Sequence, residues 1–134
     1  MNTDDAYVLF VPAPCLFLTA NGSRGNPAAR NTLVQAWRAK AAWITRAAAL
    51  PRIDEHVQIV AWVNRGHNRG GRWDPTNWID TAKACVDGLV QGGLLVDDDF
   101  TRVTGPDMRA GSMRETPGLT ILIRPHAPEK EPTA

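Results

Sequence analysis

Four short apolar runs bounded by turn-forming residues predict β-strands. The run AYVLFVP (6–12) is rich in β-branched and aromatic residues, and HVQIVAWV (56–63) alternates in a way that indicates at least one buried face. The run at 100–111 contains a Gly-Pro pair, which favours a strand at the edge of a sheet. The last run, GLTILIRP (118–125), predicts a final strand.

Two longer segments carry apolar residues at helical spacing. The first helix is predicted over residues 27–50, because Asn26 and a following proline form a typical helix start and Pro51 ends the pattern. Its apolar stripe consists of Leu33, Trp37, Ala41, Ile44 and Ala48. The second helix is predicted to begin after Asn77, whose side chain can cap it, and to stop at the glycine pair that starts at Gly92.

The order of these elements predicts the fold class. Strand, helix, strand, helix, strand, strand favours an α/β or α+β fold in which two main helices pack on a small mixed sheet. A chain of 134 residues with 43% hydrophobic residues suits one domain, which we expect over residues 1–125. Residues 126–134 are polar and Pro-rich, and they predict a disordered tail.

Composition excludes some classes of protein. No run approaches the length of a membrane-spanning helix, and the N-terminus is acidic where a secretory leader would be basic. Cys15 and Cys85 lack CxxC spacing, so they indicate neither a zinc site nor a disulfide framework. We therefore expect a soluble cytoplasmic protein whose cysteines are packing residues.

Charge is segregated along the chain although the net charge is only +1. Residues 20–72 hold nine Lys or Arg against two acids, and residues 73–99 hold six aspartates against one lysine. A basic segment suits a polyanion, and clustered carboxylates suit a divalent cation. The two together favour a protein that acts on phosphodiesters.

Acids on both sides of the second helix are candidate metal ligands. Asp74 precedes this helix, the run 97–99 follows it, and Lys83 lies within it. Metal-assisted hydrolysis needs oxygen ligands and a nearby cation for the charge that develops on phosphate. An acidic run is also typical of a solvated turn, and Lys83 with Asp87 fits a surface ion pair. Spacing alone leaves both interpretations open.

The stretch DPTNWIDTAKACVDGLVQGGLLVDDD (74–99) resembles the RusA family of Holliday junction resolvases. In that family D-x-D-N, a helix with lysine and D-(A/G)-L, and an acidic pair follow one another. Outside this central part the likeness is weaker and includes a loop with Asn21 and Arg24. The resemblance implies a small α/β homodimer in a bacterial cell or phage-infected host. Such an enzyme uses Mg²⁺, with Mn²⁺ as an alternative, to make paired nicks in a four-way DNA junction.

The same resemblance implies roles for individual residues. Asp74, Lys83 and Asp98 match catalytic positions, and Asp74, Asp97, Asp98 and Thr76 occupy the positions of metal ligands. Asn77 and Asp87 match other motif positions, the latter the acid of D-G-L.

Thr76 departs from the family pattern, because the family has a second aspartate there. A hydroxyl can coordinate Mg²⁺ but adds no charge, so a lower ion affinity is expected. Asp80 or Asp99 is an alternative source of the lost charge. Two functions stay open: an endonuclease with weakened cleavage, and a junction-binding protein of the same fold that has lost it.

Basic residues stand directly before the acids and are candidate DNA contacts. Arg65, Arg69 and Arg72 are placed to hold phosphates beside the scissile bond, with His67 in the same loop and Arg24 in an earlier one. A glycine-rich basic loop is also compatible with a plain connection.

Two tryptophans flank the acidic motif. Either Trp73 or Trp78 is able to stack on an unpaired base. Trp78 also fits the apolar stripe of the second helix, which favours a place in the core. The apolar pattern does not decide whether Trp73 lies in the core or is free to stack on a base.

Overall fold

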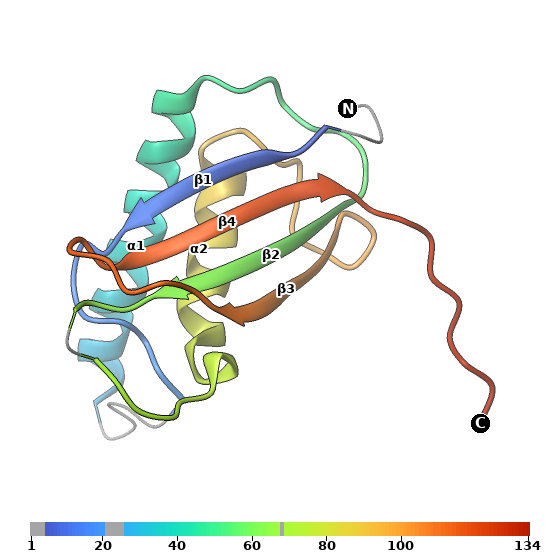
Figure 1. Cartoon of the computed structure of the whole chain (residues 1–134). Coiled ribbons are helices and arrows are strands. Elements are labelled where there is room, and N and C mark those ends of the chain that lie inside the picture. Colours follow the sequence, from blue (N-terminus) through green and yellow to red (C-terminus); the bar gives the residue numbers. More distant parts are fainter. Residues whose placement is uncertain (1–4, 21–25, 68) are drawn as a thin grey trace.

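The protein folds as a four-stranded mixed sheet with two helices packed on one face (Figure 1). The computed structural model describes residues 5–20, 26–67 and 69–134. The sheet order is β1-β4-β2-β3. The strands are β1 (Tyr7–Pro12), β2 (Val57–Asn64), β3 (Val103–Ala110) and β4 (Gly118–Pro125). At this level the predicted fold class is confirmed.

The last strand of the chain lies in the interior of the sheet. β4 pairs antiparallel with β1 on one side and with β2 on the other, and β2 pairs in parallel with β3. β3 is an edge strand, as its Gly-Pro pair predicts. That pair, Gly105-Pro106, contains a cis peptide bond, and the β2–β3 register shifts between Gln58 and Val60.

Helix α1 (Pro27–Ala48) begins as predicted and ends two residues early. The Oδ1 atom of Asn26 accepts the N–H of Ala29 at 3.1 Å, which satisfies one free donor of the first turn. Ala49 then adopts a left-handed conformation with φ of 50°, so the chain leaves the helix before Pro51. The fully buried side of α1 consists of Trp37, Ala41, Ala42 and Thr45.

The second helix starts one residue later than predicted, and its predicted cap is wrong. Asp74 caps a 3₁₀ helix, η1 (Pro75–Trp78), by accepting the N–H of Thr76 at 2.9 Å. Helix α2 (Ile79–Gln91) follows directly, and Asn77 lies inside η1 instead of capping α2. The chain thus turns earlier because an aspartate followed by proline is itself a strong helix start. The stop after Gly92 is confirmed, with Gly93 at φ of 86°.

The cysteines and the end of the chain complete the fold. Cys85 is buried in the core and Cys15 is partly buried, and both thiols are free. In the part of the chain that the structure describes, no helix is long and apolar enough to cross a membrane. Residues 126–134 form no helix or strand, and they extend away from the sheet (Figure 1). The ring of His126 nevertheless stacks on His56, with centroids 3.9 Å apart.

Candidate functional site: an acidic cavity between α2 and β3

A cavity of about 260 Å³ lies between α2 and the start of β3. Lys83 and Asp87 line it from α2, and Asp98 lines it from the turn that follows the helix. The remaining lining residues are Val86, Val103, Gly105 and Pro106. Past the glycine stop, Leu95 forms a parallel bridge with Ile53, and its backbone N–H donates to the carbonyl of Leu89 in α2 at 3.4 Å. Residues before and after the turn therefore meet in space.

The two carboxylates in this cavity interact directly. A side-chain hydrogen bond to Asp87 raises the pKa of Asp98, and partial burial and the negative charge of Asp87 raise it further. A side-chain hydrogen bond with the neighbouring Asp97 and a bond to the backbone N–H of Asp98 itself act against that rise. Asp97 also accepts the backbone N–H of Asp98 at 2.8 Å. Two carboxylates held this close favour either a shared proton or a cation bound between them.

Lys83 brings a positive charge to the same cavity. It precedes Asp87 by four residues, so both side chains lie on one face of α2. Within the part of the chain that the structure describes, the two form no ion pair. The surface ion pair between Lys83 and Asp87 is therefore not formed. The ammonium group of Lys83 is available to a ligand.

Asp74 and Thr76 lie outside this cavity. Asp74 is exposed, and its hydrogen bonds with the side chain and the backbone of Thr76 lower its pKa. Among residues 5–20, 26–67 and 69–134, no three His, Cys, Asp or Glu side chains form a group that could hold a metal. The structure thus does not gather the predicted ligands Asp74, Thr76, Asp97 and Asp98 into one set.

Asp87 is the residue that the sequence analysis did not select as a ligand. Its signal was present, because a carboxylate one turn after Lys83 shares that residue's face. Mg²⁺ is commonly held by one or two protein carboxylates and completes its shell with water and phosphate oxygens. The donor pair of Asp87 and Asp98 fits an ion of this kind, although it is smaller than the predicted set.

The basic loop occupies a different position from the acids. The Arg65 guanidinium lies 4.1 Å from the centre of the Trp73 ring and donates to the carbonyl of Arg69 at 2.7 Å. The side chains of His67, Arg69 and Arg72 are exposed. Arg24 and Asn21 lie outside the described residues. Arg65 is therefore fixed against the fold, while the three exposed side chains remain open to a partner.

The arrangement suits chemistry on a phosphate, since two carboxylates and a lysine line one cavity. No protein-family model and no curated protein matches the chain. The interpretation of this site therefore rests on its residues and their geometry.

Proposed function

We propose that this protein is a Mg²⁺-dependent endonuclease that cuts branched DNA, such as four-way junctions, by phosphodiester hydrolysis. The observation that carries the proposal is the convergence of Lys83, Asp87 and Asp98 in one cavity. The resemblance of residues 74–99 to the RusA family supports the choice of substrate.

Each residue of the cavity has a role in this proposal. Asp87 and Asp98 hold the ion, which when bound supplies Lewis-acid polarisation of the scissile phosphate. Lys83 stabilises negative charge that builds up on the phosphoryl or leaving oxygen. Asp97 positions the Asp98 backbone through its hydrogen bond. The reaction consumes one water and yields a phosphate end and a hydroxyl end.

The partners follow from the shape of the substrate. Exposed Arg69, Arg72 and His67 contact phosphates, which fix the orientation of DNA without reading its sequence. A four-way junction offers two related phosphodiesters, and a homodimer with twofold symmetry presents one cavity to each. The active form proposed here is therefore a homodimer.

A second function is favoured by the positions of Asp74 and Thr76. Because both lie outside the cavity, the donor set has only two carboxylates. A site with fewer charged ligands binds a divalent ion more weakly. The alternative is a junction-binding protein of the same fold that cuts poorly or not at all. Whether the wild type cuts a junction that it binds decides between the two functions.

The decisive experiment is cleavage of a labelled four-way junction with Mg²⁺. Wild type and Asp99→Asn should make paired nicks, while Asp98→Asn should lose at least tenfold in rate, as expected when a catalytic electrostatic group is removed. Asp99 is a matched control, because its carboxylate bonds Thr101 and does not line the cavity.

Binding is measured beside cleavage by gel shift in Ca²⁺, where the Asp98→Asn variant should bind as the wild type does. Binding by the wild type without cutting, even with Mn²⁺, would support the junction-binding alternative. Absence of any binding would contradict both functions. It would favour the interpretation of the acidic run 97–99 as a solvated turn.

A further inference from the structure

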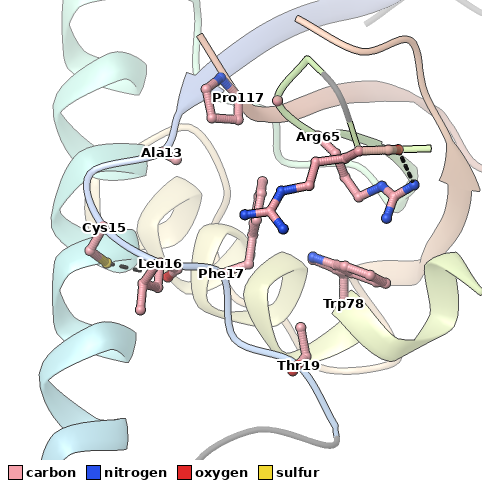
Figure 2. Close-up of a pocket in the computed structure, with 10 residues that line it drawn as sticks. Ala13, Cys15, Leu16, Phe17, Thr19, Arg65, Trp78 and Pro117 are labelled. Carbon is pink, nitrogen blue, oxygen red and sulfur yellow. Dashed lines mark hydrogen bonds between the residues drawn. The ribbon is translucent and has the colours of Figure 1, made fainter. Parts of the chain in front are cut away.

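A second cavity, of about 340 Å³, is lined in part by η1 and shares no lining residue with the acidic one. Its walls come from four parts of the chain: the segment 13–19 after β1, the loop with Arg65 and Arg69, Trp78 of η1, and Pro117 before β4 (Figure 2). Phe17 and Trp78 provide aromatic surface, and the indole nitrogen of Trp78 points into the space between Phe17 and Arg65 (Figure 2).

This aromatic cavity is held in shape by bonds to buried groups. The buried Thr81 hydroxyl accepts the N–H of Leu18 at 2.9 Å and donates to its carbonyl at 2.8 Å. The Trp37 indole donates to the carbonyl of Leu16 at 2.9 Å, and Ala20 donates to the carbonyl of Asn77. The 13–19 wall is therefore fixed to both helices without a regular element of its own.

The aromatic rings form a continuous cluster behind the cavity. Phe17 stacks on Trp37 with centroids 5.3 Å apart and meets the edge of Trp78 at 6.4 Å. Trp78 in turn contacts Trp73 at 5.1 Å in a T-shaped arrangement. A ring entering the cavity thus meets aromatic surface that is already supported and does not need to be ordered on binding.

Two buried donors at this cavity lack an acceptor within the part of the chain that the structure describes. Among the described residues, the buried side-chain donors Nε of Arg65 and Nε1 of Trp78 have no hydrogen-bond partner. Both residues line this cavity, and none of its described lining residues is acidic. Buried donors are normally satisfied, so an apolar ligand or a cation would leave them unpaired. A planar ligand with acceptor atoms and negative charge satisfies the donors, the rings and the arginines together.

From these features we infer that the aromatic cavity binds one unpaired nucleotide of the DNA substrate. The base lies against Phe17 and presents acceptor atoms to Trp78, and its phosphate contacts Arg65 and Arg69. This inference rests on the proposed function, since it takes the ligand to be part of branched DNA. Trp78 precedes the first residue of α2 and Lys83 lies in its second turn, roughly 7.5 Å further along the axis. A captured nucleotide therefore lies before the first turn of α2, and the acidic cavity begins further along the same helix, at Lys83.

The test compares two short single-stranded oligonucleotides that differ by one abasic site at the central position, with binding measured in Ca²⁺. Base–aromatic stacking predicts that the intact strand binds tighter, on the order of tenfold. Phe17→Ala should remove this difference and leave the affinity for the abasic strand unchanged. Trp78→Phe keeps a ring and removes the donor, so it should reduce the difference even where Phe17→Ala is poorly folded. Trp43→Ala is the matched control, because Trp43 is 60% exposed and lies outside the cavity.

Two results would overturn the inference. One is equal binding of the intact and abasic strands by the wild type. The other is saturation of the cavity by free dAMP at the affinity of the oligonucleotide, which would identify a small-molecule site. Junction cleavage with Mg²⁺, measured separately, keeps the two proposals apart. A protein that cuts junctions without distinguishing the strands retains its function and loses this inference. One that distinguishes the strands through Phe17 and Trp78 without cutting retains the inference and loses the nuclease.

Discussion

The carboxyl groups of Asp87 and Asp98 share a hydrogen bond in the acidic cavity, and their contact opposes folding at neutral pH. The pKa of Asp98 is raised in the folded state, so the unfolded chain loses this proton at lower pH. Stability therefore falls as pH rises from the ordinary aspartate pKa, near 3.9, through the raised value. We predict that Asp98→Asn raises Tm at pH 7. The gain in the free energy of unfolding should be below about 1 kcal/mol, because solvent screens an exposed pair.

Thermal unfolding at pH 7 and pH 3.5 checks this prediction. The gain in Tm should be present at pH 7 and absent at pH 3.5, where both forms carry a neutral side chain. Mg²⁺ should raise the Tm of the wild type by mass action and leave that of Asp98→Asn nearly unchanged. Asp99→Asn is the control and should show no gain. A lower Tm for Asp98→Asn at pH 7 would refute the repulsive pair.

At the scale of single residues, sequence reasoning found part of the acidic cavity. It selected Lys83 and Asp98, because a lysine within a helix and an acid after its stop are visible in the pattern. It did not predict that Asp87 meets Asp98, since this depends on how the chain folds back after Gly93. It placed Asp74 among the ligands, but the carboxylate of that residue caps η1. Spacing along the chain does not determine which of two available partners a carboxylate takes.

At the scale of elements, the two helices approach each other on small residues. A Cβ atom added to Gly88 of α2 would lie 2.5 Å from the Cβ of Ala41 and 2.5 Å from the carbonyl of Arg38 in α1. Overpacking of this kind costs about 1–3 kcal/mol, and the better helix propensity of alanine recovers at most about 1 kcal/mol. We therefore predict that Gly88→Ala destabilises the protein.

Urea unfolding provides the measurement, with a lower midpoint expected and an unchanged m-value. Gly70→Ala is the matched control, since no heavy atom lies within 4 Å of a Cβ built at that loop position. It should be neutral within about 0.5 kcal/mol, as is usual for surface changes. Equal midpoints for Gly88→Ala and the wild type would show that the helices separate without cost.

Elements themselves were largely predictable, and their ends were less so. The last strand was predicted at its observed bounds because turn residues flank a continuous apolar run. The C-terminal end of α1 and the start of α2 shifted by two residues or fewer, because local conformations at Ala49 and Asp74 decide them. Apolar spacing reports which face is buried and is insensitive to one turn at a helix end.

At the scale of the whole molecule, the class of fold followed from element order, but the strand order β1-β4-β2-β3 did not. Placing β4 between β1 and β2 requires pairing between segments more than a hundred residues apart, such as Tyr7 with Ile123. Apolar periodicity carries no information about such partners. The central position of β4 also brings the end of the chain to the start of β2, where Val57 pairs with Pro125.

That meeting point makes the stability of the whole molecule sensitive to mild acid. His56 stacks on His126 and bonds the hydroxyl of Thr104 at 2.9 Å. Burial lowers the pKa of His56 and the charge of His126 lowers it further, while Asp99 acts in the opposite direction. As pH falls below about 6.5, His56 binds a proton in the unfolded chain before it does so in the folded protein. Stability is therefore lost between the ordinary pKa of histidine and the lowered pKa of His56. We predict that the wild type has a lower Tm at pH 5 than at pH 7.5.

His126→Ala removes the nearby charge and uncovers the His56 ring, so the pKa of His56 should rise toward its ordinary value. The dependence of Tm on pH between 5 and 7.5 should then become weaker. An NMR titration of the His56 ring protons follows the pKa directly, and His67→Ala, in the exposed basic loop, is the control that should change neither quantity. An unchanged His56 titration in His126→Ala would mean that the two rings do not interact in solution. Because the His126 N–H also donates to the His56 carbonyl at 3.0 Å, and alanine keeps that bond, any change measured belongs to the ring alone.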